Sequence, residues 1–115
     1  MNIQTLKEIL SNFYAQYGNE RVGFVMADDT IVEVANNAAD PENGFEVSPE
    51  DVIFYIEEKG AVGIWHTHPD KNSNLSSEDY PSFLAYKDMT HFIVGNDGVR
   101  AYRYSEERKA LLQVK

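Results

Sequence analysis

The sequence predicts an α+β fold, a mixed α/β sandwich in which a mixed β-sheet carries flanking helices. Three observations lead to this prediction: an apolar stripe with helical spacing near the N-terminus, short β-rich runs beside hairpin turns, and the alternation of helical and strand segments along the chain. With 115 residues, of which 43% are hydrophobic and 25% charged, we expect one globular domain over residues 1–115.

The N-terminal part predicts a helix followed by a β-hairpin. Apolar residues at spacings of three and four predict a helix over 3–17 that ends before Gly18. Residues 21–27 and 30–34 are rich in Val, Ile and Phe, and the pair Asp28-Asp29 between them makes a tight connection. The helix would bury the stripe formed by Ile3, Leu6, Ile9, Leu10, Phe13 and Tyr17.

The middle of the chain predicts a helix and a buried strand. Residues 36–44 are dense in Asn, Asp, Pro and Gly and predict a loop. A second helix follows, capped by Ser48 with Pro49 at its first position, and it runs to about residues 59–60. The short apolar run 61–65 predicts a buried strand whose end delivers His66.

The C-terminal part predicts a loop, a third helix and three strands. The polar run 66–75 is a loop, and residues 76–79 have the form of a helix N-terminus, with the helix continuing to about residue 87. Residues 90–94 and 99–104 form strands joined by the hairpin turn 95–98. Residues 110–114 add a last strand.

Composition excludes several classes of partner and chemistry. The chain holds 19 acidic and 10 basic residues, a formal charge of −9, so its field repels nucleic acids and anionic membranes. It contains no cysteine, which excludes disulfides, thiolate ligands and cysteine nucleophiles. Any zinc site must therefore use histidine and carboxylate ligands.

The N-terminus, Met1 to Lys7, has no basic segment followed by a long apolar run, and no window approaches the ~18 apolar residues that span a bilayer. We expect a soluble, unprocessed protein. The absence of cysteine fits a cytoplasmic protein, or a phage-encoded one that acts in the host cell.

The segment His66-Thr67-His68-Pro69, followed by Asp79, predicts a metal site. Histidines two apart in extended backbone project to the same side, so both imidazoles can reach one ion. A ten-residue connection can bring Asp79, in the first turn of the third helix, to the same point. Two nitrogens and one oxygen, with a fourth position left open for water, are typical of catalytic zinc sites.

Hydrolysis by such a site needs a second carboxylate that takes a proton from the water and returns it to the leaving amine. Glu20 lies after the Gly18-Asn19 turn and directly before the first strand. It is the best upstream candidate if that strand is adjacent to the strand that carries His66.

The pattern His66-x-His68-Pro69-x6-Ser76-x2-Asp79, with Glu20 and Gly23 upstream, resembles the JAMM motif of the MPN/JAB (Mov34/PAD-1) zinc metalloproteases. The resemblance covers nearly the whole chain. It implies a cytidine-deaminase-like MPN/JAB fold and a minimal prokaryotic or phage-type member. It departs from the common pattern at Thr67, where serine is usual, and at Val22, where bacterial relatives often have cysteine.

The resemblance implies a role for each matching residue. His66, His68 and Asp79 would hold Zn²⁺, Glu20 would be the general base and acid, and Ser76 would hydrogen-bond the developing oxyanion. The expected activity is hydrolysis of a peptide or isopeptide bond. We expect the substrate to be bound as a strand added beside the His66 strand.

Substrates open to such an enzyme are the tails of ubiquitin-like or sulfur-carrier proteins and phage-tail or cell-wall peptides. The chain lacks the long insertions of eukaryotic deubiquitinating members, which argues against a linkage-specific deubiquitinase. Two alternatives stay open: a non-catalytic MPN-type scaffold or interaction module, and a hydrolase of amide bonds outside proteins. The protein would act as a monomer or homodimer.

Each site residue also has an ordinary structural interpretation. Ser76 and Asp79 form a common helix-capping arrangement, which is compatible with a catalytic role. We expect His91 to lie at a strand edge without function, and Trp65 to face away from the metal side into the core. Tyr80, Tyr86, Tyr102 and Tyr104 are expected to serve packing. The pairs Asp28-Asp29 and Glu57-Glu58 read as solvated positions.

Overall fold

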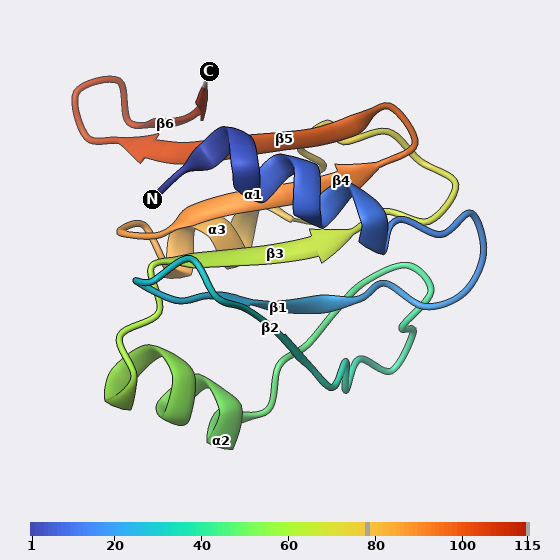
Figure 1. Ribbon diagram of the computed structural model, residues 1–115, viewed down its shortest axis with the longest axis horizontal. Helices are drawn as coiled ribbons and strands as arrows, with labels where there is room; N and C mark the ends of the chain where they lie inside the picture. The colour runs from blue at the N-terminus through green and yellow to red at the C-terminus, as the bar shows by residue number, and fades with distance from the viewer. Residues whose placement is uncertain (78, 115) are drawn as a thin grey trace.

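The computed structural model describes residues 1–77 and 79–114. Within them the chain forms a mixed sheet of six strands in the order β2-β1-β3-β4-β5-β6, with helices on both faces (Figure 1). The prediction of a mixed α/β domain is thereby confirmed. The strands are β1 (Val22–Val25), β2 (Ile31–Val34), β3 (Gly63–Thr67), β4 (Thr90–Gly95), β5 (Gly98–Ser105) and β6 (Ala110–Val114).

Strand β3 lies in the middle of the sheet, paired on both sides. It runs antiparallel to β1, with Val22 opposite His66, and parallel to β4, with His66 opposite Ile93. The predicted hairpins β1–β2 and β4–β5 are both present, and β6 pairs with β5. Because both edges of β3 are occupied, the expectation that a substrate strand adds beside the His66 strand is wrong.

The first helix is shorter than its apolar spacing predicts. Helix α1 covers Ile3–Leu10 and continues as one 3₁₀ turn, η1 (Ser11–Phe13). Tyr14 is already extended, with ψ 136°, and Tyr17 is 79% exposed. Phe13 still belongs to the buried stripe, because its ring packs on the Trp65 ring, 4.9 Å between centroids, and Tyr17 is the residue that leaves it.

The second helix begins as predicted. The Ser48 hydroxyl accepts a hydrogen bond from the Asp51 N–H at 3.2 Å, and Pro49 occupies the first turn. One α-helical turn, α2 (Pro49–Val52), runs into a π-helical segment, η2 (Ile53–Glu58). The helix therefore ends close to the predicted boundary.

The third helix, α3 (Tyr80–Ala85), begins later and ends earlier than predicted. Asp79 is its N-cap residue, so it precedes the first turn instead of lying in it. The Asp79 N–H bonds the carbonyl and the hydroxyl of Ser76, which closes a turn ahead of the helix. At the other end the backbone of Tyr86 leaves the helical region, with φ −128° and ψ 58°.

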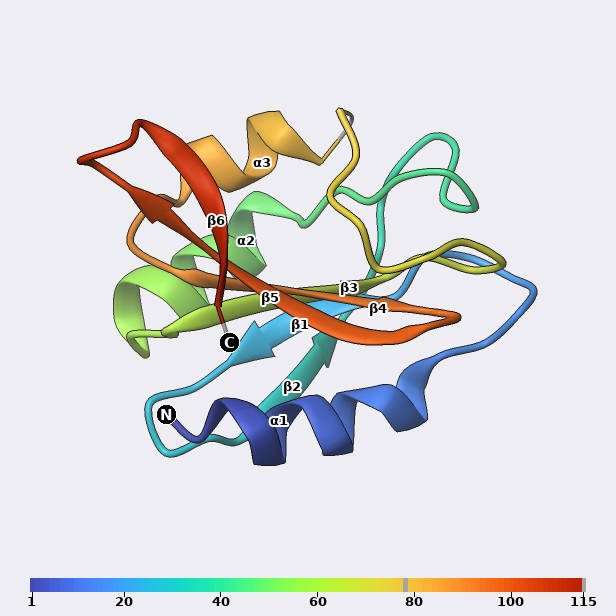
Figure 2. The ribbon, with the colours of Figure 1, turned by 90° about the horizontal axis from the view of Figure 1, so that it is seen from above.

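The sheet separates two apolar layers (Figure 2). On one face, α1 buries Leu6 and Leu10 against Trp65 and Phe92. On the other, η2 and α3 pack on the alternate residues of the same strands, including Phe24, Ile64, Ile93 and Tyr102. Trp65 is fully buried on the α1 face, so the prediction that it points away from His66 is confirmed.

Gly23 is required by the position of the Trp65 indole, whose Nε1 donates a hydrogen bond to the Val32 carbonyl at 3.2 Å. A Cβ at Gly23 would lie 1.8 Å from that carbonyl oxygen and 2.7 Å from the indole nitrogen. The glycine upstream of the His-x-His segment therefore has a packing explanation.

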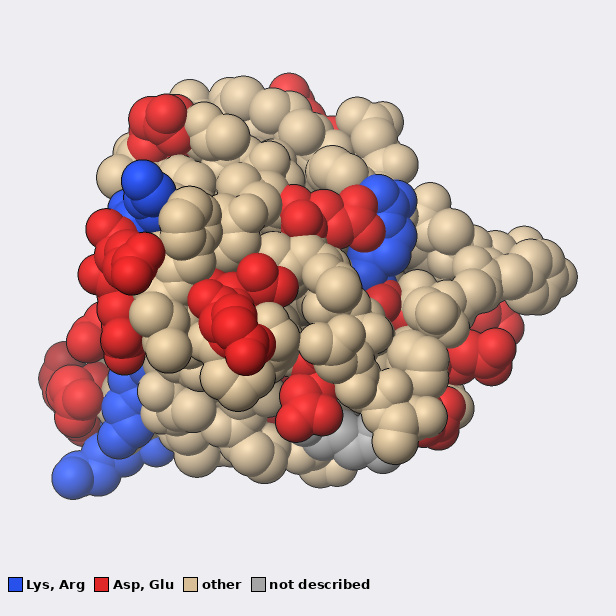
Figure 3. Space-filling view, turned by 90° about the horizontal axis from the view of Figure 1, so that it is seen from below, with Lys and Arg blue, Asp and Glu red and all other residues tan. Residues whose placement is uncertain are grey.

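In the surface view of Figure 3, acidic side chains are spread over the face, while basic ones gather in a few places. This distribution is consistent with the net charge of −9. Within the described parts of the chain, no helix combines the length and the apolar character needed to cross a membrane.

Candidate metal centre

The sheet register brings Glu20 to the two histidines. Val22 pairs with His66, and the pattern continues one step beyond β1, because the Arg21 N–H donates to Thr67 Oγ1 at 2.9 Å and the Thr67 N–H donates to the Arg21 carbonyl at 2.9 Å. Glu20 then falls opposite His68. The adjacency on which the choice of Glu20 depended is confirmed.

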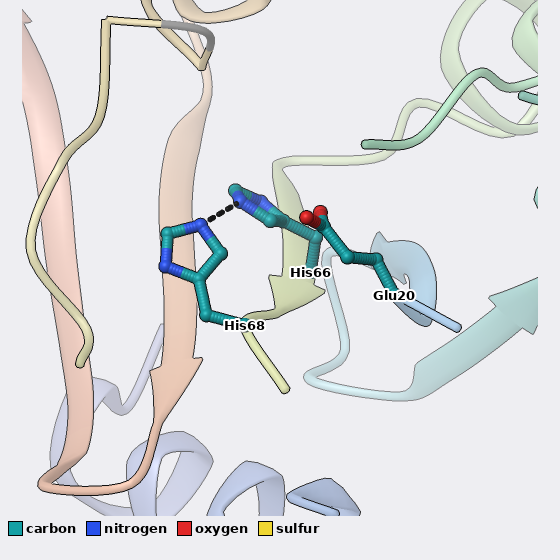
Figure 4. A group of neighbouring side chains, drawn as sticks. All are labelled: Glu20, His66 and His68. Carbon is teal, nitrogen blue, oxygen red and sulfur yellow. Dashed lines mark hydrogen bonds between the residues drawn. The ribbon is translucent and has the colours of Figure 1, made fainter. Parts of the chain in front are cut away.

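Glu20, His66 and His68 are all buried and point toward one another (Figure 4). One ligand atom from each lies within 4.8 Å of the others, a spacing that could hold a metal ion. Glu20 is 4% exposed although it precedes the first strand. Glutamate side chains are mostly exposed, so one this deeply buried next to two imidazoles is unusual.

Asp79 joins the same group from the start of α3. His66 Nε2 lies 3.1 Å from Asp79 Oδ1, and His68 Nε2 lies 3.1 Å from Asp79 Oδ2. The two Nε2 atoms are 3.0 Å apart. Ligand atoms of a tetrahedral zinc ion at ~2.0–2.1 Å are about 3.3 Å from one another, so a small outward shift suffices to admit the ion.

A second feature sets the chemical form of His68. Its Nδ1 lies 2.9 Å from the Asn72 carbonyl, which can only accept, so Nδ1 carries a proton and donates it. In the neutral ring this leaves Nε2 as the lone-pair atom that faces His66 and Asp79. A hydrogen bond from the second ring nitrogen to a carbonyl is the common way to orient a metal-binding histidine.

His66 differs from His68 in this respect. Among the described residues its Nδ1 has no hydrogen-bond partner, and the Phe45 ring packs on the imidazole at 4.6 Å between centroids. The orientation of His66 is thus fixed by aromatic packing and by its place in β3.

The pKa values follow from burial and from the mutual contacts. Burial alone would raise the pKa of Asp79, but hydrogen bonds from His66 and His68 outweigh it and hold the carboxyl pKa far below its usual range. Burial lowers the pKa of His66. Burial also acts to lower the pKa of His68, but its hydrogen bonds to Asp79 and Asn72 raise it above the ordinary value. When His68 is also protonated at Nε2, that proton lies between Nε2 and Asp79, in the position that a cation would take.

Ser76 lies beside Asp79, and the two residues form reciprocal bonds. The Ser76 N–H donates to Asp79 Oδ2 at 3.2 Å, and Ser76 Oγ accepts from the Asp79 N–H at 3.2 Å. These two contacts are the ones expected if Ser76 and Asp79 form a helix-capping arrangement. Ser76 also lines a cavity of about 280 Å³ together with Glu20, His68 and Asp79.

Two groups that sequence reasoning missed support this arrangement. Asn36 donates to the Glu20 carbonyl at 2.8 Å and accepts from the Ala38 and Glu46 N–H groups, so it ties the loop after β2 to the Glu20 backbone. Its position in an Asn-rich loop indicated a turn and nothing more. The Asn72 carbonyl gave no signal at all, because every residue carries one.

The loop between His68 and Asp79 is held by the β4–β5 hairpin. The Asp97 carboxylate accepts from the Ser73 N–H at 2.8 Å, and the Tyr102 hydroxyl donates to the Ser73 carbonyl at 3.2 Å. A Cβ at Gly95 would lie 2.3 Å from the Ser73 nitrogen, so the loop crosses directly over that glycine. The hairpin turn thus positions the loop that supplies Asn72 and Ser76.

The expectation that His91 lies at a strand edge is wrong. It is in β4, an interior strand, and is 1% exposed, with the Phe83 ring stacked on it at 4.3 Å between centroids. Parallel pairing places it opposite Ile64, two residues before His66, so it stays outside the cluster of Glu20, His66, His68 and Asp79.

The chain matches no protein-family model and no curated protein at a significant level. The interpretation of the site therefore depends on its own geometry and on the motif.

Proposed function

We propose that the chain is a zinc-dependent metallopeptidase or isopeptidase of the JAMM (MPN/JAB) kind. One observation carries the proposal: Nε2 of His66, Nε2 of His68 and the carboxylate of Asp79 lie 3.0–3.1 Å apart in a buried cluster, with Glu20 beside the two histidines. Two imidazoles and one carboxylate around one point are a common catalytic zinc set.

In the proposed site His66, His68 and Asp79 would hold the ion. Zinc supplies Lewis acidity, which makes water more acidic and polarises a carbonyl group. Asp79 suits this position because its depressed pKa keeps the carboxylate ionised. The Asn72 carbonyl suits it also, because it keeps the proton of His68 on Nδ1 and leaves Nε2 free to bind.

Glu20 would take a proton from the water that attacks the scissile carbonyl and return it to the leaving amine nitrogen. Its place suits this role, because Glu20 is buried beside the two histidines. The Ser76 hydroxyl would donate a hydrogen bond to the carbonyl oxygen as it becomes negative.

An alternative ligand set consists of Glu20, His66 and His68. Mutation of Glu20 and of Asp79 distinguishes it from the proposed set. If Asp79 is the ligand, Asp79→Asn should lose zinc and Glu20→Gln should retain it. If Glu20 is the ligand, the two variants should behave in the reverse way. The reverse result would contradict the assignment of Glu20 as base.

The test of the proposal is zinc content per chain by elemental analysis, on wild type and on His68→Ala, prepared without chelator. We expect about one zinc in wild type and little in His68→Ala. His91→Phe is the matched control, because it removes a buried histidine from the neighbouring strand and should retain the metal. Negligible zinc in wild type after reconstitution would refute the proposal and favour a non-catalytic scaffold.

Activity is tested with peptides, with tails of ubiquitin-like and sulfur-carrier proteins, and with cell-wall cross-links. For any substrate that is cleaved, Glu20→Gln should lower kcat by about 10²–10⁴-fold while zinc content is unchanged. Cleavage that survives in Glu20→Gln would exclude Glu20 as the base.

A further inference from the structure

Residues 36–46, in the loop between β2 and α2, hold the backbone of Glu20. The Glu20 N–H donates to the Pro41 carbonyl at 2.7 Å, and the Glu20 carbonyl accepts from Asn36 Nδ2 at 2.8 Å. The residue that follows Glu20 is bonded to β3 through both its N–H and its carbonyl. The sheet therefore holds the chain up to the residue after Glu20, and the loop holds the proposed base.

The side-chain amide of Asn36 uses both its donor and its acceptor capacity. Nδ2 donates to the carbonyls of Glu20 at 2.8 Å and Gly44 at 3.0 Å, and Oδ1 accepts from the N–H groups of Ala38 at 3.0 Å and Glu46 at 3.1 Å. Because a carbonyl only accepts and a backbone N–H only donates, these partners fix which end of the amide is the oxygen. The four bonds join Glu20 to the loop through one side chain.

The same amide holds Phe45 from both sides. Two of its bonds, one to a carbonyl and one to an N–H, go to the peptide groups that flank Phe45. The Phe45 ring packs on the His66 imidazole, with 4.6 Å between the centroids. Since His66 lies in β3, which is paired on both sides, this contact docks the loop on the middle of the sheet. Asn36 thus links the proposed base to the strand that carries a proposed ligand.

We propose that Asn36 is a positioning residue, whose amide fixes Glu20 to the docked loop and so keeps the Glu20 carboxylate directed at the two histidines, as in Figure 4. The effect on catalysis rests on the proposed function. The hold on the Glu20 backbone does not, and it is measurable in metal-free protein. The four bonds of Asn36 all go to backbone groups, so it acts through Glu20 and is not itself a catalytic residue.

Two substitutions remove this hold in different ways. In Asn36→Asp one oxygen keeps the two N–H partners, but the other replaces the donor and faces two carbonyl oxygens. Asn36→Ala removes the amide and adds no charge near Glu20. Placement matters for a base, because a displacement of about 1 Å can cost about 10²-fold in rate.

The first test is amide hydrogen exchange by NMR on the metal-free full chain, in wild type and in both Asn36 variants. We expect the Glu20 N–H to exchange about tenfold faster or more in the variants, while the Arg21 N–H, bonded to β3, keeps its wild-type rate. Asn43→Ala is the matched control and should change neither rate. It removes another asparagine from the same loop, whose amide bonds an exposed carboxylate three residues away.

Two results would overturn the proposal. Equal acceleration of the Glu20 and Arg21 N–H groups would mean that Asn36 stabilises the fold as a whole. Unchanged exchange at Glu20 would mean that the loop holds it without the amide. If Asn36→Asp does not fold, Asn36→Ala decides between these outcomes, because it places no acceptor against the two carbonyls.

The second test is a double-mutant cycle on the zinc-loaded chain, with any substrate that wild type cleaves. Asn36→Ala should lower kcat about 10–100-fold, with KM and zinc content unchanged. In the Glu20→Gln background the same substitution should leave kcat unchanged, because the group that it positions is already lost. An equal fall in both backgrounds, or a loss of zinc that accounts for the fall in kcat, would overturn the positioning role.

The two tests separate failure of the inference from failure of the proposed function. Faster exchange confined to Glu20, in a chain whose wild type binds no zinc, would refute the proposed function and confirm the hold of Asn36 on Glu20. Cleavage by wild type, with equal effects of Asn36→Ala in both backgrounds, would refute the positioning role and leave the proposed function standing.

Discussion

On the α1 face of the sheet, Trp65 and Phe92 are fully buried against a single helix, whereas on the opposite face the adjacent residues of the same strands are His66 and His91. Strands β3 and β4 thus supply apolar rings to one side and imidazoles to the other. The face sealed by α1 is a packed core. The face covered by shorter helices and loops contains the cluster of Glu20, His66, His68 and Asp79 and the cavity that Ser76 lines.

This difference shows that strand alternation places the Trp65 and Phe92 rings on one face of the sheet and the His66 and His91 imidazoles on the other. Changes on the α1 face should alter the free energy of unfolding without altering metal content. Changes at His66, on the opposite face, should alter metal binding. Four predictions test this separation, in order of decreasing expected effect.

The largest effect is expected at Trp65. Trp65→Ala removes a fully buried ring and its hydrogen bond to Val32, and we expect a loss of about 3–5 kcal/mol in the free energy of unfolding, measured in urea. Ile9→Ala, at a site 44% exposed on α1, is the control and should change stability far less. A loss below about 1 kcal/mol at Trp65 would show that the α1 face is not the stabilising one.

The second effect is stabilisation by zinc. A ligand that binds only the folded state at a free concentration of about 100 times its Kd adds about 2.7 kcal/mol. We expect zinc to raise the Tm of wild type and of Ile9→Ala alike, and to leave His68→Ala unchanged. An equal rise in His68→Ala would place the ion elsewhere in the molecule.

The third effect is a pH dependence from His91. Its pKa is about 4 in the folded chain against 6.5 ordinarily, so folding disfavours its protonated form. The contribution of this group to stability is complete above pH 6.5 and is lost as the pH falls through 4. Between pH 7 and 4, wild type should lose about 2–3 kcal/mol more than His91→Phe.

This measurement uses metal-free protein in chelator, so that release of zinc at low pH makes no contribution. Parallel stability curves for the two proteins would mean that the His91 ring is solvated in the folded state.

The smallest effect is expected at the surface. Arg21, directly before β1, and Glu33, in β2, form an ion pair at 2.6 Å, but both side chains are more than a third exposed. Glu33→Gln should cost about 0.5 kcal/mol or less, and the difference from wild type should shrink in 1 M salt. A loss above 1.5 kcal/mol, undiminished by salt, would indicate that the pair is more than a surface contact.

Sequence patterns predicted correctly those parts of the fold that depend on residues close together in the chain. The turn at residues 95–98 set the β4–β5 hairpin, the Ser48-Pro49 pair set the start of α2, and alternation placed Trp65 and His66 on opposite faces. Helix ends were less predictable. Tyr17 continues the spacing of the apolar stripe, but Phe13 packs on Trp65, a contact between segments distant in sequence.

For the candidate site, residue types and spacing identified the residues that come together, but not their supports. Neither the Asn72 carbonyl nor the Asn36 amide has a pattern that sequence reasoning could use. The sequence also did not predict the interior position of β3, because its pairing with β1 and β4 depends on the packing of the whole sheet. For the same reason the strand-addition hypothesis and the edge position of His91 were both wrong.

The central position of β3 has a consequence for folding kinetics. Glu20, His66 and Asp79 meet only when β3 has joined β1 and the loop before α3 has closed over the β4–β5 hairpin, and contacts between such distant segments form late in folding. An ion held at this point should therefore leave the refolding rate nearly unchanged and act almost wholly by slowing unfolding. Zinc would then govern how long the folded chain survives, and the sheet alone how quickly it forms.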